Sequence, residues 1–174
     1  MDNKLSVETS AVLSSVGAVF DHVAHAVPSI RDILPLYRDL LGGQPTAGGI
    51  NPWGGHLAVH FQFPPGAIIE LLQPARKDSP SVGAFLERSP RGGLHHLTFK
   101  VPSLETALES IAAAGLNPFG TMLGDPGWQE TYLHPRETGG VLIQLAQAAP
   151  GIPPPLNRPL DELLDQADAF RATA

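Results

Sequence analysis

The chain has 174 residues, enough for one compact domain, and its 43% hydrophobic and 16% charged residues are ordinary values for a globular protein. Its 17 acidic residues outnumber its 11 Lys and Arg residues, and the resulting net charge of −6 disfavours a surface that follows the phosphates of a nucleic acid. Because the chain contains no cysteine, disulfides, thiolate metal sites and cysteine nucleophiles are excluded.

The N-terminal region carries no targeting pattern. No apolar run reaches the roughly 20 residues that span a bilayer. The first residues also lack the basic start and sustained apolar stretch of a secretory signal. We therefore expect a cytoplasmic protein that binds neither membranes nor nucleic acid. Residues 1–15 show no periodic pattern and are predicted to form a flexible segment.

An internal repeat organises residues 16–147. The segment HVAHAVPSI, which starts at His22, matches HLTFKVPSL, which starts at His96, at an offset of 74 residues. The same offset places GAIIELLQ, from Gly66, over GVLIQLAQ, from Gly140. Two separate blocks that share one offset indicate a duplicated module, with module 1 at residues 16–75 and module 2 at residues 91–147.

Each copy predicts a strand, a helix and three further strands. The first strand ends at Val-Pro-Ser, where proline cannot continue a strand ladder and serine can cap a helix. Helices are predicted over 30–41, interrupted at Pro35, and over 104–115, ending at Gly115. Two of the three further strands are placed by their sequence pattern, at 55–63 and 67–73 in the first copy and at 127–135 and 140–146 in the second. The predicted fold class is α+β, built from two βαβββ modules.

Three segments lie outside the modules. Residues 75–90 connect them and include a predicted short helix, SVGAFLER. Residues 148–158 are rich in proline and predict an extended linker. Residues 159–174 predict a C-terminal helix with one apolar face, which we expect to dock on its own domain or on a second subunit.

The duplication singles out four polar positions. They are His22 and Glu70 in the first copy, and His96 and Gln144 in the second, separated by 48 residues in both copies. Of the adjacent pair His95 and His96, only His96 is the repeat partner of His22. Because successive side chains of a strand point to opposite faces, His95 should face away. Glu70 lies in an otherwise apolar strand, where a carboxylate is costly unless it is paired or metal-bound.

Further polar residues could line a site or have structural roles. His56 and His60 lie on one face of a predicted strand, near Trp53, and could act as a base and a substrate-binding group or simply face solvent. Glu130 is the only carboxylate in the matching strand of the second copy. Structural or surface roles are expected for His25, His95 and His134.

Four motifs carry a resemblance to a known family. FDHVAHAVPSI, IIELLQP, HHLTFKVPSL and HPRETGGVLIQLAQ resemble the first and last strands of both modules of the vicinal oxygen chelate superfamily. This superfamily includes glyoxalase I, methylmalonyl-CoA epimerase, extradiol dioxygenases and bleomycin resistance proteins. The resemblance covers about residues 17–147 and is closest to the epimerase-like and glyoxalase I-like members.

The resemblance implies an architecture and a metal site. The two modules would pair into a cupped, incomplete eight-stranded barrel around one divalent ion, in a chain that forms a homodimer. Matched position by position, the implied metal ligands are His22, Glu70, His96 and Gln144. Two neutral imidazoles, one carboxylate and one amide oxygen leave two open positions in an octahedral shell. A set without thiolates suits Mn, Co, Ni, Fe(II), Zn or Mg.

The implied activity is proton abstraction from a small carbonyl or thioester substrate chelated on the ion, as in an isomerase, epimerase or lyase. Gln144 cannot accept a proton at neutral pH, so Glu70 or His60 is the expected catalytic base. Methylmalonyl-CoA epimerases typically carry an amide and then a carboxylate at the two strand-end positions. This chain has Glu70 first and Gln144 second, the reverse order.

Two alternatives of different class remain open. His22, His96 and Glu70 also form the two-histidine, one-carboxylate set of an Fe(II)-dependent dioxygenase. Extradiol enzymes, however, usually place their carboxylate on the last strand of the module pair, where this chain has glutamine. The second alternative is a non-catalytic, small-molecule-binding protein of the resistance type, although those members commonly lack the metal ligands.

Overall fold

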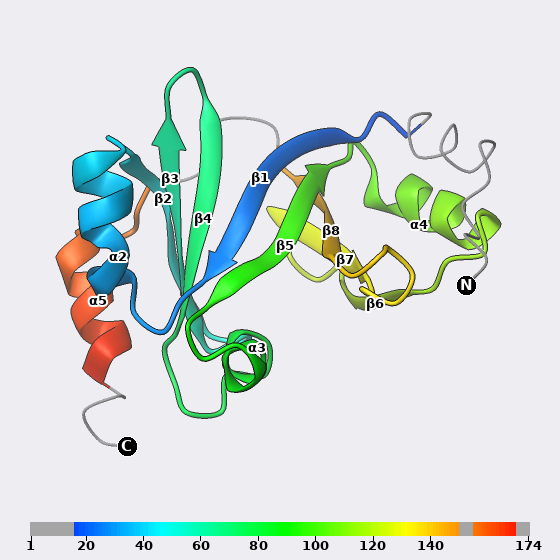
Figure 1. The fold of residues 1–174 in the computed structure, drawn as a ribbon. Coiled ribbons are helices and arrows are strands. Elements are labelled where there is room, and N and C mark those ends of the chain that lie inside the picture. Colours follow the sequence, from blue (N-terminus) through cyan, green and yellow to red (C-terminus); the bar gives the residue numbers. More distant parts are fainter. Residues whose placement is uncertain (1–15, 150–154, 170–174) are drawn as a thin grey trace. The chain divides into compact units, whose positions relative to one another are not determined.

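The computed structural model describes residues 16–149 and 155–169 (Figure 1). The predicted N-terminal segment 1–15, the middle of the predicted linker and residues 170–174 of the predicted last helix lie outside these ranges. Among the described residues, no helix has both the length and the apolar character needed to cross a membrane. The described chain divides into a first unit, residues 22–95 with 155–169, and a second unit, residues 16–21 with 96–149.

The strands follow the predicted duplicated pattern. The first module contains β1 (Val19–Ala26), α2 (Ile30–Leu34), the π-helix η1 (Pro35–Leu40), β2 (Gln44–Asn51), β3 (His56–Phe63) and β4 (Ala67–Pro74). After α3 (Val82–Arg88), the second contains β5 (Gly93–Lys100), α4 (Leu104–Ala113), β6 (Pro118–Met122), β7 (Trp128–Leu133) and β8 (Leu142–Ala148), and α5 (Leu160–Ala169) follows.

The pairing of strands is the same in both copies. β1 runs parallel to β4, and β3 runs antiparallel to β2 and β4. Likewise β5 runs parallel to β8, and β7 runs antiparallel to β6 and β8. The strand order β2-β3-β4-β1-β5-β8-β7-β6 makes one mixed, eight-stranded sheet from two βαβββ modules, which confirms the predicted fold class.

Serine and proline set the helix boundaries. The hydroxyl oxygens of Ser29 and Ser103 each accept the backbone N–H of the residue three positions later, as N-caps do. Pro35 has no N–H to donate, and the predicted helix over 30–41 divides there into α2 and η1. Beyond α4, Gly115 adopts a φ of +73°, which favours glycine and ends the helix as predicted.

A duplicated glutamine ties the last strand of each module to its helix. In the first unit, Oε1 of Gln73 accepts the backbone N–H of Ile30 at 2.7 Å. In the second, Oε1 of Gln147 accepts the backbone N–H of Leu104 at 2.7 Å. Gln73 and Gln147 are the final residues of the two repeated blocks, so the repeat preserves a partner for an otherwise unsatisfied amide at each helix start.

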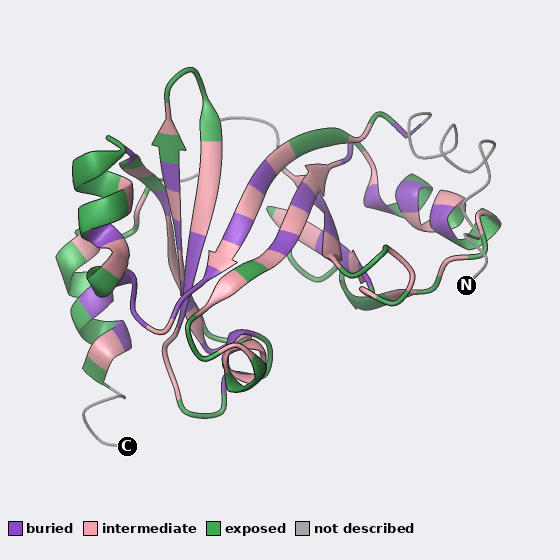
Figure 2. Ribbon diagram, viewed as in Figure 1, coloured by how far each residue is buried: buried purple, intermediate pink, exposed green. Residues whose placement is uncertain are grey.

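The first unit has an apolar core, and Figure 2 colours each residue by how far it is buried. Leu57, Val59 and Phe61 of β3 are fully buried, and they pack in one cluster with residues of α2 and α5. From α5 the buried members are Leu163, Leu164 and Ala167. The predicted C-terminal helix therefore docks on its own chain, where it covers the β3 face opposite to His56 and His60.

The second unit has a separate apolar core. Leu104, Ala107 and Ile111 of α4 are fully buried and pack in one cluster with Leu133 of β7 and Leu145 of β8. Residues of α4 at this helical spacing form one apolar face, as the sequence predicts. The other face of these two strands carries Glu130 and Tyr132 of β7 and Gln144 of β8.

Candidate functional site

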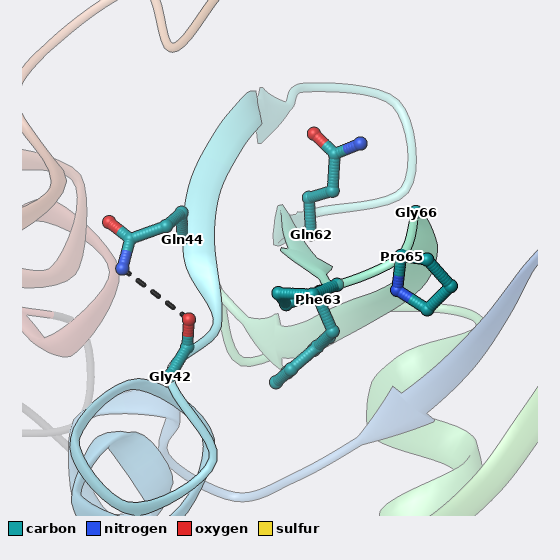
Figure 3. Close-up of a pocket in the computed structure, with 7 residues that line it drawn as sticks. Gly42, Gln44, Gln62, Phe63, Pro65 and Gly66 are labelled. Atoms are coloured by element: carbon teal, nitrogen blue, oxygen red, sulfur yellow. Dashed lines mark hydrogen bonds between the residues drawn. The ribbon is translucent and has the colours of Figure 1, made fainter.

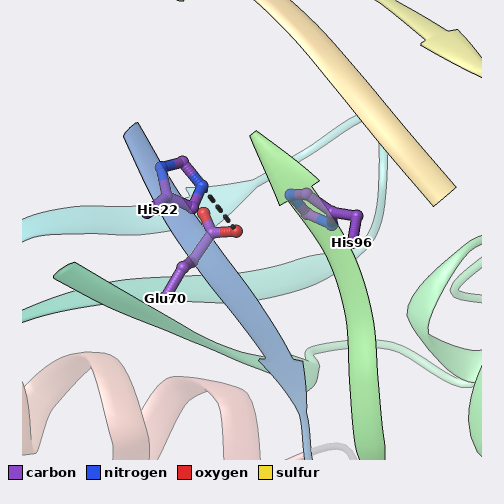
Figure 4. A group of neighbouring side chains, drawn as sticks. All are labelled: His22, Glu70 and His96. Atoms are coloured by element: carbon purple, nitrogen blue, oxygen red, sulfur yellow. Dashed lines mark ion pairs between the residues drawn. The ribbon is translucent and has the colours of Figure 1, made fainter. Parts of the chain in front are cut away.

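In the first unit, Glu70 lies between two imidazoles. Nε2 of His22 is 3.5 Å from one carboxylate oxygen of Glu70, and Nε2 of His60 is 3.3 Å from the other. Figure 4 shows the ion pair between His22 and Glu70. The ring centroids of His22 and His60 are 4.7 Å apart. The first unit thus brings together two candidate metal ligands, His22 and Glu70, and the two candidate bases, Glu70 and His60.

Strand register explains this grouping. Glu70 of β4 is directly opposite His60 of β3 in an antiparallel pair, so the two side chains share a face. Parallel pairing aligns Ala24 of β1 with Glu70. His22 lies two residues before Ala24 and therefore points to the same face. The side chains of His22 and Glu70 are 1% and 12% exposed, so this face is largely closed to solvent at the pair.

In the second unit, His96 and Gln144 are both 5% exposed. Gln144 of β8 is opposite Thr98 of β5 and Tyr132 of β7. His96 lies two residues before Thr98 on β5, and its ring is 6.4 Å from that of Tyr132, edge to face. The strand carrying His96 is drawn in Figure 4. Both second-module positions selected by the repeat are therefore buried near Tyr132.

The amide of Gln144 is held at both ends. Its Nε2 donates to a carboxylate oxygen of Glu130 at 2.7 Å and to the hydroxyl of Tyr132 at 3.0 Å. Its Oε1 accepts the hydroxyl of Thr98 at 2.5 Å. Glu130 is 6% exposed and also accepts the indole N–H of Trp128 at 2.7 Å. The structure thus places Glu130 against a predicted metal ligand.

Sequence reasoning did not select Trp128, Tyr132 or Thr98. Trp128 and Tyr132 lie two residues before and after Glu130 on β7, and Thr98 lies two residues after His96 on β5. Side chains two residues apart on a strand share a face. Polar groups at this spacing around a selected residue are the signal that would have identified them.

The remaining candidates lie elsewhere. His56 is opposite Pro74 on β4 rather than opposite Glu70, and Trp53 is 81% exposed. Nδ1 of His25 shares a hydrogen bond of 2.8 Å with the hydroxyl of Tyr37, and burial lowers the pKa of His25. Nδ1 of His134 accepts the backbone N–H of Arg136 in a turn. The contacts of His25 and His134 fit the structural roles expected for them.

His95 has surroundings unlike those of His96. Its ring packs edge to face on Phe85 of α3, with centroids 5.1 Å apart. Burial lowers the pKa of His95 to about 4, although the negative charge of Glu70 raises it. His95 is therefore a neutral imidazole packed on a helix, whereas His96 lies beside Tyr132, in line with the strand alternation that separates adjacent residues.

The first unit also has a pocket of about 410 Å³ at the β3–β4 turn (Figure 3). It is lined by Gly42, Gln44, Gln62 and residues 63–66. At its rim, Nε2 of Gln44 donates to the carbonyl oxygen of Gly42 at 3.4 Å. None of the lining side chains is charged or an imidazole, so the pocket offers room but no proton carrier.

Known proteins match both the sequence and the fold. The family model of the Glyoxalase/Bleomycin resistance protein/Dioxygenase superfamily matches residues 21–132. Ethylmalonyl-CoA/methylmalonyl-CoA epimerase of Cereibacter sphaeroides is 35% identical over 130 residues, which cover 73% of this chain and 96% of the relative.

Two solved structures are similar at lower identity. Methylmalonyl-CoA epimerase from Mycobacterium tuberculosis has a TM-score of 0.67 and 27% identity, covering 75% of this chain and 88% of its own. A variant of Streptomyces coelicolor methylmalonyl-CoA epimerase in complex with 2-nitronate-propionyl-CoA has a TM-score of 0.65 and 26% identity, covering 75% and 96%. Proteins named as epimerases of CoA thioesters therefore recur among both kinds of match.

Proposed function

Because the chain belongs to the glyoxalase/bleomycin resistance protein/dioxygenase superfamily, we propose that it is an epimerase of a small CoA thioester, which removes and returns a proton next to the thioester carbonyl. Epimerase relatives support this reaction class, and one of them was solved with 2-nitronate-propionyl-CoA. The observation that carries the proposal is Glu70, a largely buried carboxylate with an imidazole at each oxygen.

We assign a divalent metal to this protein through the ligands His22, Glu70, His96 and Gln144. Two of these ligands lie together in each unit: His22 is 3.5 Å from Glu70 in the first, and His96 and Gln144 share one strand face in the second. The donor chemistry fits, since two buried imidazoles, a carboxylate and an amide suit Mn, Co, Ni, Fe(II), Zn or Mg. When bound, the ion would supply positive charge that favours loss of a proton next to the substrate carbonyl.

Glu70 is the proposed base, with His60 as its proton partner. The imidazole of His60 is within 3.3 Å of a Glu70 oxygen, close enough to share a proton with it. His60 is also the more exposed of the two, at 17% against 12%, so it offers a route for protons to leave. Gln144 has no acidic or basic group and can only bind or orient.

The test is hydrogen exchange. The protein is incubated in deuterated buffer with a methylmalonyl-type thioester and Mn, Co, Ni or Fe(II), and the substrate mass and oxygen uptake are followed together. Deuterium should enter next to the carbonyl without oxygen consumption. Glu70→Gln should lower the exchange rate by about 100-fold or more, because it removes a general base. Gln144→Glu should lower it less, because Glu70 remains.

Glu87→Gln is the matched control for the loss of a carboxylate, since Glu87 is exposed on α3. Its exchange rate should equal that of the wild type. Oxygen uptake with Fe(II) and a catechol would replace the proposal with a dioxygenase. No exchange and no oxygen uptake with any metal or substrate would leave a small-molecule-binding protein.

A further inference from the structure

We propose that Glu130 is a positioning residue that turns the side-chain amide of Gln144 so that its oxygen, rather than its nitrogen, is presented as the metal ligand. This inference rests on the metal site assigned under the proposed function. It concerns a residue that binds neither metal nor substrate and acts through Gln144.

An amide ligand has an orientation problem that a carboxylate lacks. The two oxygens of Glu70 are chemically equivalent, so either can bind a cation. The two ends of the Gln144 amide differ, because only the oxygen has lone pairs to offer a cation and the NH₂ group is a donor. A glutamine ligand therefore needs neighbours that distinguish its two ends.

Glu130 and Thr98 make this distinction. An ionised carboxylate only accepts hydrogen bonds, so the Glu130 oxygen 2.7 Å away must face the NH₂ group of Gln144. Thr98 donates to the amide oxygen from the opposite side. All three side chains are buried, at 6% exposure or less, and a flipped amide would put its oxygen against the carboxylate in a buried place, where the repulsion is strong.

Glu130 is itself fixed. One of its oxygens accepts the indole N–H of Trp128 at 2.7 Å, and the other accepts the hydroxyl of Tyr132 at 3.0 Å. These two donors also offset the cost of burying the carboxylate. The orienting group is therefore held in one place before any ligand binds.

In the first module the proposed ligand is a carboxylate, and the positions equivalent to Glu130 and Thr98 can be compared with those of the second module. Glu130 is opposite Ala146, and the equivalent pair in the first module is Ala58 opposite Leu72. Thr98 is opposite Gln144, and the equivalent pair there is Ala24 opposite Glu70. Alanine thus occupies both places beside Glu70. The two orienting side chains occur only in the module whose ligand is an amide.

The central experiment is Glu130→Gln, which replaces an acceptor-only group by one that can also donate. Without metal, the NMR signals of the Gln144 side-chain amide, assigned by their loss in Gln144→Glu, should shift and broaden as the amide samples both orientations. The affinity for Mn²⁺ should fall about 10-fold to 100-fold, as expected when the partner of a metal ligand is removed. Glu109→Gln, which removes an exposed carboxylate from α4 of the same unit, should change neither.

A further variant separates orientation from charge, and a check of folding excludes misfolding. Thr98→Val removes the other orienting contact without changing charge, and it should also weaken Mn²⁺ binding. The folded state of each variant is checked by its circular dichroism spectrum before Mn²⁺ is added. Unchanged Gln144 amide signals in folded Glu130→Gln would overturn the inference, as would full Mn²⁺ affinity in Thr98→Val. If the wild type binds no divalent ion, the assigned metal site fails, while the amide signals still decide the orienting role.

Discussion

Burial makes His95 sensitive to acid. Burial against α3 is the largest cause that lowers its pKa to about 4, and His56 lowers it further while Glu70 raises it. In the unfolded chain the same side chain titrates near its ordinary value of about 6.5. Between about pH 6.5 and about pH 4 the unfolded state therefore binds more protons than the folded state. The stability that the neutral His95 contributes is present above this window and is lost as the pH falls through it.

The prediction is that His95→Gln flattens the pH dependence of stability. For the wild type, protonation of His95 should lower the free energy of unfolding by up to about 3 kcal/mol between pH 7 and pH 4. His95→Gln should lack this part of the loss. Urea unfolding at both pH values, with a chelator present so that no metal is released, measures it. Equal slopes for the two proteins would contradict the assigned titration.

At the level of single residues, the repeat selected the four predicted ligand positions but not the residues that contact them. A fixed offset of 74 would pair His60 with His134, which lies in an exposed turn. The strand register instead makes His60 equivalent to Tyr132, since they lie opposite Glu70 and Gln144. His60 follows His22 by two more positions than Tyr132 follows His96, so a fixed sequence offset cannot reveal which of these residues are equivalent.

Among the elements outside the two modules, α5 packs on the apolar core of the first unit. Leu163 and Leu164 are at most 1% exposed in the cluster that also holds the inward side chains of β3. At the polar edge of the helix, Asp168 accepts the side-chain N–H of Gln73, which itself caps α2. The helix therefore closes the apolar face of the first unit.

Truncating the apolar face of α5 should destabilise the protein far more than removing its charges. Leu164→Ala should lower the free energy of unfolding by about 2–5 kcal/mol, as for other buried leucines. Asp165→Ala breaks an exposed ion pair with Arg31 and should cost less than about 1 kcal/mol. Urea unfolding of both variants measures the difference. A loss below about 1 kcal/mol for Leu164→Ala would show that α5 does not seal the core.

The sequence predicted the type of these elements well because each carries a strong local pattern. Helical spacing identified α4, and alternating residues identified β3 and β7. The division of the first helix into α2 and η1 was indicated only by Pro35, since the wider π-helical turn has no sequence period of its own. The sequence could not predict where α5 packs, because its apolar face could pack on any apolar surface.

For the molecule as a whole, the exposed strand edges predict self-association. β2 and β6 are the terminal strands of the sheet order, and Phe119 and Met122 of β6 are 43% and 42% exposed. Unpaired strand edges are ready sites for pairing with another chain. We expect a homodimer, with twice the chain mass of 18.4 kDa by light scattering in the micromolar range. Met122→Lys should lower the dimer fraction if β6 forms the contact. A single-chain mass across that range would contradict the dimer.

The first unit is formed from two segments that are far apart in the sequence, and this affects the order in which the protein folds during synthesis. The first unit is built from residues 22–95 and from residues after 154, whereas the residues translated between them belong to the second unit. When β1 to β4 have left the ribosome, Leu163 and Leu164 of α5 have not yet been translated. While the second module is being translated, α5 therefore cannot bury Leu57, Val59 and Phe61 of β3. Such a nascent chain exposes apolar strand surface and is a substrate for chaperones. A chain that ends before residue 160 would thus be prone to aggregation, even though it contains both modules.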